Sequence, residues 1–586
     1  MIFNKITKAF AIIKQFLGIL TRKFKIRFVF NFIAILGASL LETLSVSLLL
    51  PFVQAILNPD KLMQNKYASI FVQFLNIKTT NQFILATSLF VVAFFILKNI
   101  YQILCRYWQN KFRADLQVHI SDTILTSYMS RPYSFFIDHN SSELMRNVMN
   151  DANSLTYSVE SLFTIFTTLF IICFMSAFLI ITEASIAIGL CLSAVIVLVG
   201  PVFFIGKPLR RIGEKMRVVE ADCFKWCNQS FQGIKEIIVT KKEMYFAEQY
   251  KNTYKRKNSM DVKKCVIEYI PSRLIESVCI SALILIVCYN IIHGDAVSDV
   301  MISKLAVFAM AAFRLMPTVS SLSNNINSLI HQSVALEAVY NNIQDAKIFI
   351  AKKGNEKVSF DKELEIKDLT FAYPKNKEKL ILNKANAQIK IGDAIGIKGS
   401  SGAGKTTCVD IILGLLEPQS GDVLIDGVKL SDANVNSWRE KISYVPQTAY
   451  LIDDTIRANI AFGIPEKEVD DARIERAMKE AMLYDYVESL PDKDRTVVGE
   501  RGVQMSGGQR QRLSIARALY TNPSIIIFDE ATSALDEITE REIMESIDNL
   551  IGQKTLIIIA HRLSTLKKCN KIFEVGEGKI TVTENS

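Results

Sequence analysis

The stretch Gly399-Ser-Ser-Gly-Ala-Gly-Lys405-Thr406-Thr407 decides the fold of the second half of this chain. It follows Asp393–Lys398, which has the pattern of a buried strand, and it opens the helical run Thr406–Leu415. Glycines let backbone N–H groups approach a phosphate, and the following helix N-terminus favours negative charge. This context predicts a nucleotide-binding loop, with Lys405 on the β/γ-phosphate oxygens and Thr406 on Mg²⁺. The predicted nucleotide contacts are Gly399, Ser400, Ser401, Gly402, Ala403, Gly404, Lys405, Thr406 and Thr407.

Two further segments in this half carry chemistry. Ile525-Ile-Ile-Phe-Asp529-Glu530 has the pattern of a buried strand that ends in two carboxylates. Asp529 suits Mg²⁺, directly or through water, and Glu530 can polarise the water that attacks a phosphate. Ser506-Gly507-Gly508-Gln509 precedes the helical pattern Arg510–Leu519. A hydroxyl, two glycines and a helix N-terminus predict a second anion-binding site there.

Composition divides the chain in two. Of its 586 residues 50% are apolar, and the mean hydropathy is +0.23. Long apolar runs fill residues 1–345, whereas 350–586 have the composition of an ordinary soluble α/β domain. The net charge of +9 does not indicate nucleic-acid binding, because much of the excess flanks hydrophobic segments. The ten cysteines form no CxxC pair, so we expect neither a metal site nor disulfides.

Six segments are long and apolar enough to cross a membrane. A bilayer core of ~30 Å needs ~20 apolar residues in a helix. We therefore expect a cytoplasmic elbow helix over 1–27, a six-span membrane domain over 28–345 and an ATPase domain over 350–586. The expected spans are Phe28–Leu57, Phe83–Tyr107, Leu162–Ile181, Ala184–Ile205, Tyr269–Ile292 and Ile302–Leu322.

Lysine and arginine predict the orientation in the membrane. Seven precede the first span, fifteen lie in Lys207–Lys264, and the turn at Thr182 and Glu183 has none. The positive-inside rule then places both termini and the two long loops in the cytoplasm, which we expect to be that of a bacterium, at its inner membrane.

The two long loops, 108–160 and 206–268, are polar but keep a helical period. We expect the spans to continue through them as helices. An amphipathic stretch in each, Tyr133–Asn140 and Phe231–Ile238, could lie across the tip. These stretches are interpreted as transmission helices, with a simple solvated helical hairpin as the alternative.

Together these motifs resemble those of ABC transporters of the exporter type, over nearly the whole chain. The resemblance implies that Tyr373, in Phe-Ala-Tyr-Pro, stacks on adenine. It implies that Gln447, in Tyr-Val-Pro-Gln, senses Mg²⁺ and the membrane domain, and that His561, in Ile-Ala-His-Arg, contacts the γ-phosphate. Ser533–Asp536 resembles the D-loop. Thr496–Gly502 resembles the X-loop, by which the family's exporters contact intracellular helices, so export is favoured over import.

The same resemblance implies the fold, cofactors and assembly. The fold class is an α-helical membrane domain with long cytoplasmic extensions, fused to an α/β P-loop NTPase domain. ATP and Mg²⁺ are the implied cofactors, with Thr406, Gln447 and Asp529 at the metal. A homodimer is implied, because the loop at Lys405 of one chain would face Ser506–Gln509 of the other. The one departure is Met505, where the family usually has leucine.

Ionisable residues inside spans are costly and are candidate functional residues. Lys98 and Arg106 lie eight residues apart, which favours a shared helix face, and Arg273 could instead pair with Glu276. Taken together they predict a positively charged cavity suited to a phosphate or pyrophosphate group. The candidates for substrate contact are Glu42, Lys98, Arg106, Arg273 and Arg314.

A narrower resemblance concerns the cargo. Phe308–Pro317, and Leu41-Glu42 followed by Leu50-Pro51-Phe52, resemble flippases of lipid-linked oligosaccharides in bacterial protein glycosylation. This resemblance implies a polyprenyl-pyrophosphate glycan as substrate. Export of peptides, drugs or other lipids is the alternative. An ABC ATPase without a transport role is a third hypothesis, which six fused spans disfavour.

Overall fold

The computed structural model describes residues 16, 18–57, 59, 63, 69, 72, 73, 75, 77–182, 184–292, 299–350, 354, 356–374, 376, 378–499, 502, 504–531, 537–560 and 566–585. In parts of the helices, including 184–207 and 299–316, only the backbone is described. The chain divides into two compact units. The helical unit runs to Ser130 and continues over His139–Lys347, and the ATPase unit comprises Arg131–Asp138 and the chain from Ile348 onward.

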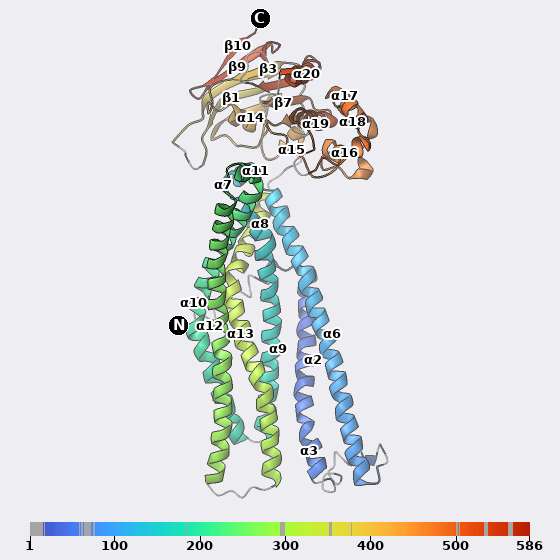
Figure 1. Ribbon diagram of the computed structural model, residues 1–586, viewed down its shortest axis with the longest axis vertical. Helices are drawn as coiled ribbons and strands as arrows, with labels where there is room; N and C mark the ends of the chain where they lie inside the picture. The colour runs from blue at the N-terminus through green and yellow to red at the C-terminus, as the bar shows by residue number, and fades with distance from the viewer. Residues whose placement is uncertain are drawn as a thin grey trace. The chain divides into compact units, whose positions relative to one another are not determined.

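The helical unit has a helix at each of the six predicted spans (Figure 1). Three of these, within Arg22–Ile56, Thr80–Met129 and Ser141–Ile181, are long and apolar enough to cross a membrane in the part of the chain whose side chains are described. The helices are α2 (Arg22–Ser47), α3 (Leu49–Leu57), α6 (Thr80–Met129), α8 (Ser141–Arg146), the π-helix η1 (Asn147–Asp151), α9 (Ala152–Thr182), α10 (Ala184–Gln232), α11 (Ile234–Val239), α12 (Glu243–Ile292) and α13 (Asp299–Ile350).

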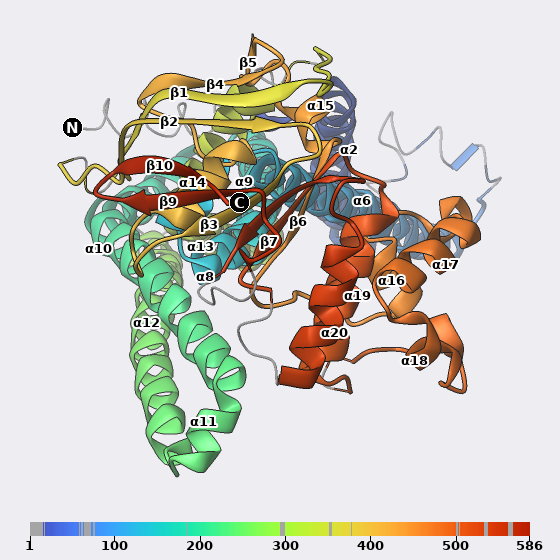
Figure 2. The ribbon, with the colours of Figure 1, turned by 90° about the horizontal axis from the view of Figure 1, so that it is seen from above.

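The long helices extend well beyond the apolar spans, as the helical period of the loops predicts. α6 runs on to Met129, and α10 and α12 form a hairpin with α11 at its tip (Figure 2). Both predicted amphipathic tips are short helices, α11 and α7 (Tyr133–Asp138).

Aromatic packing joins α2, α6 and α9. The ring of Phe28 stacks on Phe163 with centroids 5.2 Å apart, and Phe112 meets Phe163 edge-on at 5.6 Å. Phe112 and Phe163 are fully buried. Such pairs add to the burial of apolar area, so these three helices form one packed group.

The ATPase unit contains two sheets. The four-stranded antiparallel sheet has the order β2-β1-β4-β5, and the six-stranded sheet has the order β10-β9-β3-β8-β7-β6. In the larger sheet only β10 is antiparallel to its neighbour. The strands are β1 (Glu363–Phe371), β2 (Leu382–Lys390), β3 (Ala394–Lys398), β4 (Ser420–Ile425), β5 (Val428–Lys429), β6 (Ile442–Val445), β7 (Ile525–Asp529), β8 (Thr555–Ile559), β9 (Lys571–Gly576) and β10 (Lys579–Glu584).

Two hydrophobic cores lie on opposite faces of the larger sheet. Ile525 and Ile527 of β7 join the core shared with the antiparallel sheet and α14, whereas Ile526 and Phe528 join the core under α17, α19 and α20. Burial on both faces explains why β7 and β8 are apolar without alternation. The helices are α14 (Lys405–Ile412), α15 (Val435–Arg439), α16 (Ile456–Ile460), η2 (Glu466–Glu468), α17 (Asp471–Glu480), α18 (Tyr484–Glu488), η3 (Lys493–Arg495), α19 (Gly507–Tyr520) and α20 (Glu537–Asp548).

Candidate functional site

The loop that follows β3 has the geometry of a phosphate cradle. Lys405 is buried, and its Nζ donates to the carbonyl oxygens of Gly399 at 2.9 Å and Ser400 at 3.2 Å. Gly404 has φ +102°, and a Cβ there would lie 2.8 Å from Ile381. Only glycine tolerates both conditions. The ammonium group is therefore held inside a loop of backbone groups that leads into the N-terminus of α14.

Parallel strands bring the other predicted groups to the same edge of the sheet. Gln447 follows β6, Asp529 ends β7, and the loop of Lys405 follows β3. The carboxyl ends of parallel strands lie at one edge, where ligands bind in open α/β sheets. The Gln447 Nε2 donates to the Glu530 carboxylate at 2.8 Å, so these two predicted residues are in contact.

Glu530 has an unusual backbone. Its φ is +49°, which is uncommon for a non-glycine residue. Its N–H donates to the carbonyl of Ile559, the last residue of β8, at 3.0 Å. Backbone strain of this kind concentrates at functional sites. The bend turns the chain directly after Asp529 and separates the two carboxylates.

Charge at this edge is only partly compensated. Burial raises the pKa of Asp529, and so does the charge of Glu530. The Tyr444 hydroxyl, which donates to the Asp529 Oδ2 at 2.9 Å, and the charge of Lys405 lower it. Burial and the charge of Asp529 raise the pKa of Asp410, on α14, to about 6. Tyr444 and Asp410 were not predicted, because only the pairing of β6 with β7 and the direction of α14 bring them to Asp529.

The donor set fits Mg²⁺ and a nucleotide. Mg²⁺ prefers hard oxygen ligands. Three are available here: the under-compensated carboxylate of Asp529, the hydroxyl of the exposed Thr406 and the amide oxygen of Gln447. Over the described part of the chain no three His, Cys, Asp or Glu side chains gather as a metal site. A metal here would thus complete its shell with nucleotide phosphates and water.

Tyr373 lies at the same loop. Its hydroxyl is 3.1 Å from the Thr407 Oγ1, and its ring meets Phe371 edge-on. The predicted aromatic contact and the predicted phosphate loop are therefore adjacent.

Ser506 begins α19 through a capping box. Its Oγ accepts from the Gln509 N–H at 3.3 Å, and the Gln509 Oε1 accepts from the Ser506 N–H at 2.8 Å. Gly507 is exposed. The helix N-terminus is thus ordered, and the Ser506 hydroxyl proton is left to donate to an anion.

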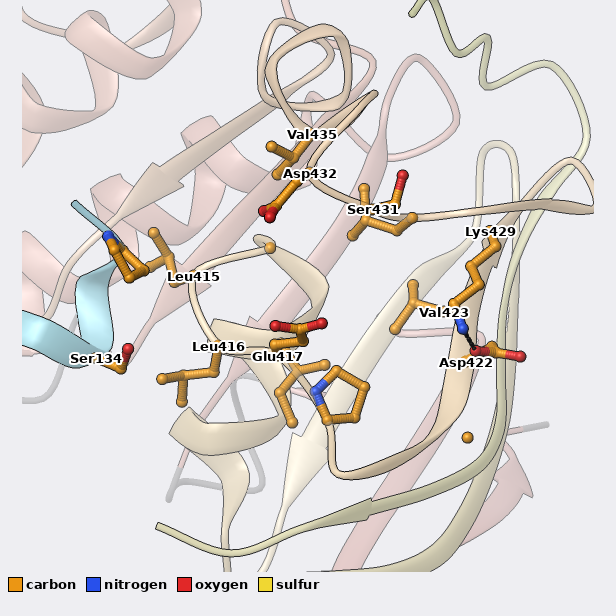
Figure 3. Close-up of a pocket in the computed structure, with 16 residues that line it drawn as sticks. Ser134, Leu415, Leu416, Glu417, Asp422, Val423, Lys429, Ser431, Asp432 and Val435 are labelled. Carbon is orange, nitrogen blue, oxygen red and sulfur yellow. Dashed lines mark ion pairs between the residues drawn. The ribbon is translucent and has the colours of Figure 1, made fainter. Parts of the chain in front are cut away.

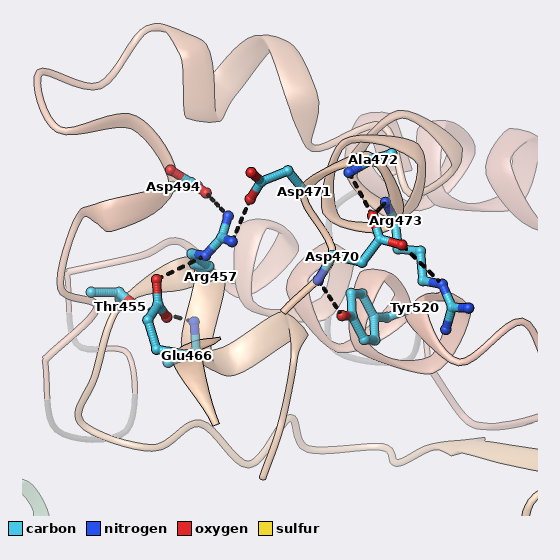
Figure 4. A network of polar contacts seen from close by, with 10 residues as sticks. Thr455, Arg457, Glu466, Asp470, Asp471, Ala472, Arg473, Asp494 and Tyr520 are labelled. Carbon is cyan, nitrogen blue, oxygen red and sulfur yellow. Dashed lines mark hydrogen bonds and ion pairs between the residues drawn. The ribbon is translucent and has the colours of Figure 1, made fainter. Parts of the chain in front are cut away.

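An arginine organises the segment before Ser506 (Figure 4). Arg457 of α16 contacts three carboxylates: Asp471, Asp494 at 3.2 Å and Glu466 at 3.2 Å. The Ile456 N–H donates to the Thr496 carbonyl at 2.9 Å. Arg457 thereby ties α16, α17 and η3 around the start of the predicted X-loop.

The segment Arg131–Asp138 belongs to the ATPase unit. Two of its residues, Pro132 and Ser134, line a pocket (Figure 3). The pocket is also lined by Leu415 and Leu416, which follow α14, and by Asp432 and Val435. Burial raises the pKa of Tyr133, and so do Asp410 and Tyr373. Ser134 also lines a second pocket with Tyr373, so this tip lies beside the predicted adenine contact.

Each predicted substrate residue whose side chain is described forms an ion pair. Lys98 pairs with Glu42 at 2.9 Å, and both are buried. Arg106 pairs with Glu160 of α9, and Arg273 pairs with Glu276 at 2.7 Å. Lys98 and Arg106 contact different helices, because eight residues leave side chains about 80° apart around a helix. These pairs reduce the excess positive charge that the sequence predicts.

Some predicted residues cannot be placed. His561 and Ser533–Asp536 lie outside the described residues, as do Glu500 and most of 1–27. The backbone of Arg314 is in α13, and its side chain is not described.

Comparison with known proteins agrees with this architecture. The family model "ABC transporter transmembrane region" matches residues 28–313, and "ABC transporter" matches 382–533. An ATP-dependent lipid A-core flippase of Saccharophagus degradans is 30% identical over 84% of this chain and 83% of its own length. A lipid A-core flippase of Desulfotalea psychrophila is 33% identical over 65% and 66%. The structure of a bacterial Atm1-family ABC exporter with ATP bound has a TM-score of 0.76 at 21% identity, covering 97% of this chain and 96% of that one.

A helical membrane domain fused to a nucleotide-binding domain defines a membrane transporter that hydrolyses ATP. The chain belongs to the ABC transporter family and has the exporter arrangement of its two domains. It is thus an ATP-hydrolysing translocase, with lipid flippases among its relatives.

Proposed function

We propose that this chain flips an anionic lipid-linked molecule, a polyprenyl-pyrophosphate oligosaccharide, out of the cytoplasmic leaflet of a bacterial inner membrane. The observation that carries the proposal is the match to two lipid A-core flippases over most of the chain. One net positive charge remains where Arg106 and Arg113 share the carboxylate of Glu160, and it supports an anionic group. The local resemblance at Phe308–Pro317 supports a pyrophosphate-linked glycan over other lipids.

The proposed hydrolysis gives each predicted residue one role. The Lys405 ammonium would leave its carbonyl partners for the β/γ oxygens of ATP. Mg²⁺, when bound through Thr406, Gln447 and Asp529, would offset phosphate charge. The Glu530 carboxylate would accept a proton from the attacking water, and His561 would contact the γ-phosphate.

We further propose a homodimer in which Ser506–Gln509 of one chain faces the nucleotide held by Lys405 of its partner. The helix N-terminus at Ser506 then completes each site, so ATP clamps the two ATPase domains together. Both termini would lie in the cytoplasm.

The test is reconstitution into vesicles with a lipid-linked oligosaccharide, measuring ATP-dependent flipping and the stimulation of ATPase. We expect flipping that is lost when Arg273 and Arg314 are both changed to Gln. Flipping of lipid A-type lipids, or export of peptides or drugs, in place of the glycan would replace the proposed cargo. Normal glycan transport by the double variant would contradict the roles of these arginines.

A further inference from the structure

Two arginines of α6 converge on one carboxylate of α9. The Arg106 Nη2 lies 2.5 Å from the Glu160 Oε1, and the Arg113 Nη1 lies 3.2 Å from the Glu160 Oε2. Seven residues separate the arginines, so they lie two turns apart on one face of the helix. Each carboxylate oxygen of Glu160 is thus taken by a different guanidinium group, in the way a small oxyanion is bound between two arginines.

The charge and hydrogen bonding of this cluster are unbalanced. Two guanidinium groups and one carboxylate leave one net positive charge. The Arg113 Nε is buried and has no hydrogen-bond partner among the described residues. The Arg106 side chain is 51% exposed, so the cluster is open to a ligand from one side.

One aromatic ring contacts the cluster, and two others pair where α6 meets α2. The Arg113 guanidinium lies over the Tyr157 ring at 5.0 Å, and Tyr157 is itself 44% exposed. Trp108 meets Phe30 edge-on, with ring centroids 5.1 Å apart. Tyrosine and tryptophan gather at the level of lipid headgroups. Arg106 also stands at the end of the expected span Phe83–Tyr107, where that level lies.

We propose that Arg106 and Arg113 form a binding site for the phosphate of an anionic lipid headgroup in the cytoplasmic leaflet, with Glu160 occupying it until a phosphate displaces the carboxylate. The placement in that leaflet rests on the proposed function. Phosphate binds arginine bidentately, and a phosphate monoester or a pyrophosphate carries more charge than a carboxylate, so it competes for the same donors. The site is a first capture point for the cargo, separate from the Lys98–Glu42 pair.

The decisive variants are Glu160→Gln and the double variant Arg106→Gln/Arg113→Gln, in the full chain. The first removes the competing anion and keeps both cations, whereas the second removes the cations. We expect Glu160→Gln to bind phosphatidic acid about 5-fold tighter, and the double variant about 10-fold weaker, corresponding to opposite changes of ~1 and ~1.4 kcal/mol. Binding is measured without ATP, by titrating detergent-solubilised protein and comparing with phosphatidylcholine, whose phosphate is paired with its own ammonium.

A structural brace between α6 and α9 gives a different result. If the cluster is only a brace, both variants lower the unfolding temperature and bind phosphatidic acid with the same affinity as the unaltered chain. That result would overturn the proposal. The matched control is Arg210→Gln, an exposed arginine paired with Glu214 at 3.2 Å on α10, and its lipid affinity should not change. Should the double variant not fold, Glu160→Gln is compared with Glu214→Gln, which removes the same charge beside Arg210. A gain of affinity in Glu160→Gln alone supports the site, and an equal gain in both variants would overturn it.

Inorganic pyrophosphate separates the two sources of phosphate. A lipid site is supported if pyrophosphate displaces phosphatidic acid only at millimolar concentration and phosphatidic acid binds at least tenfold more tightly than pyrophosphate. Equal affinity for both would overturn the lipid assignment in favour of a soluble phosphate. Arginine-dependent lipid binding in a protein that does not flip the glycan would refute only the proposed cargo.

Discussion

At the scale of single residues, Glu530 shows how the backbone sets the chemistry. The residue follows a buried strand, has φ +49°, and directs its carboxylate to Gln447. A neighbouring carboxylate, Asp529, is directed to Tyr444. Two adjacent acids thus have separate partners. This suits Asp529 to the proposed Mg²⁺ and Glu530 to the attacking water.

The first prediction concerns Glu530→Gln. We expect ATPase turnover to fall by at least ~100-fold, since a general base contributes 10²–10⁴-fold, while ATP still traps a closed dimer. Phosphate release and size-exclusion chromatography with ATP measure the two effects. Glu577→Gln is the matched control, because Glu577 also has φ +49° but lies in the turn between β9 and β10. Unaltered turnover in Glu530→Gln would refute the role of this carboxylate.

The second prediction concerns Asp410, whose pKa is raised to about 6 by burial and by Asp529. A raised carboxyl pKa means that the folded state disfavours the charged form, so stability falls as pH rises through 6. Asp410→Asn should therefore raise the unfolding temperature at pH 8 and change it little at pH 4, without nucleotide or metal. Asp393, whose pKa is lowered despite burial by Lys571 at 2.8 Å and its other hydrogen-bond partners, gives the opposite sign. Asp393→Asn should destabilise at pH 8.

At the scale of elements, short helices depend on contacts from elsewhere in the chain. α16 has five residues, too few to be stable alone. Ion pairs of Arg457 join α16 to α17 and η3. Arg517 of α19 donates to the carbonyl of Asn459, a residue of α16, at 2.8 Å. These two arginines hold α16, whose Ile456 N–H donates to the carbonyl of Thr496 at the start of the predicted X-loop.

The third prediction concerns Arg457→Ala. We expect a loss of ~1–3 kcal/mol in the free energy of unfolding. The Arg457 side chain is only 12% exposed, and its removal leaves three carboxylates facing one another. Lysine should restore less than half of the loss, since it has no planar fork. Chemical denaturation of the ATPase unit measures this. Arg473→Ala is the control: Arg473 is 57% exposed, pairs with Asp470 three residues away, and should cost about 0.5 kcal/mol or less. Equal losses in both variants would contradict the role of Arg457.

At the scale of the whole molecule, the proposed sites need two chains. The fourth prediction uses a mixture of Lys405→Ala chains and Gly507→Asp chains. Asp at the exposed start of α19 is compatible with the helix but repels ATP phosphates. If sites form between chains, mixed dimers keep one intact site and trap nucleotide with vanadate, whereas each variant alone traps none. Absence of trapping in mixed dimers isolated with two different affinity tags would refute the shared site.

The fifth prediction, opposite changes of lipid affinity in Glu160→Gln and Arg106→Gln/Arg113→Gln, also belongs to the whole molecule. It concerns the capture of a lipid headgroup by α6 and α9, a step that would precede the ATP-driven step.

Much of this protein is determined by sequence alone, because the deciding patterns are local. The phosphate loop, the strand before Asp529, the capping residue Ser506 and the apolar lengths of the spans each lie within one continuous stretch. Backbone geometry and helical period act over a few residues, so such elements can be predicted without knowing the fold.

Only the tertiary structure decided which charges meet. The carboxylate of Glu42 pairs with Lys98, and that of Glu160 joins Arg106 and Arg113, across 47 to 56 residues of sequence. Tyr444 and Asp529 are 85 residues apart. These contacts depend on which helix faces and strand edges come together during packing, and no spacing along a single element encodes that. The phosphate loop at Lys405 was therefore predictable, whereas the balance of charge around its metal and along the spans was not.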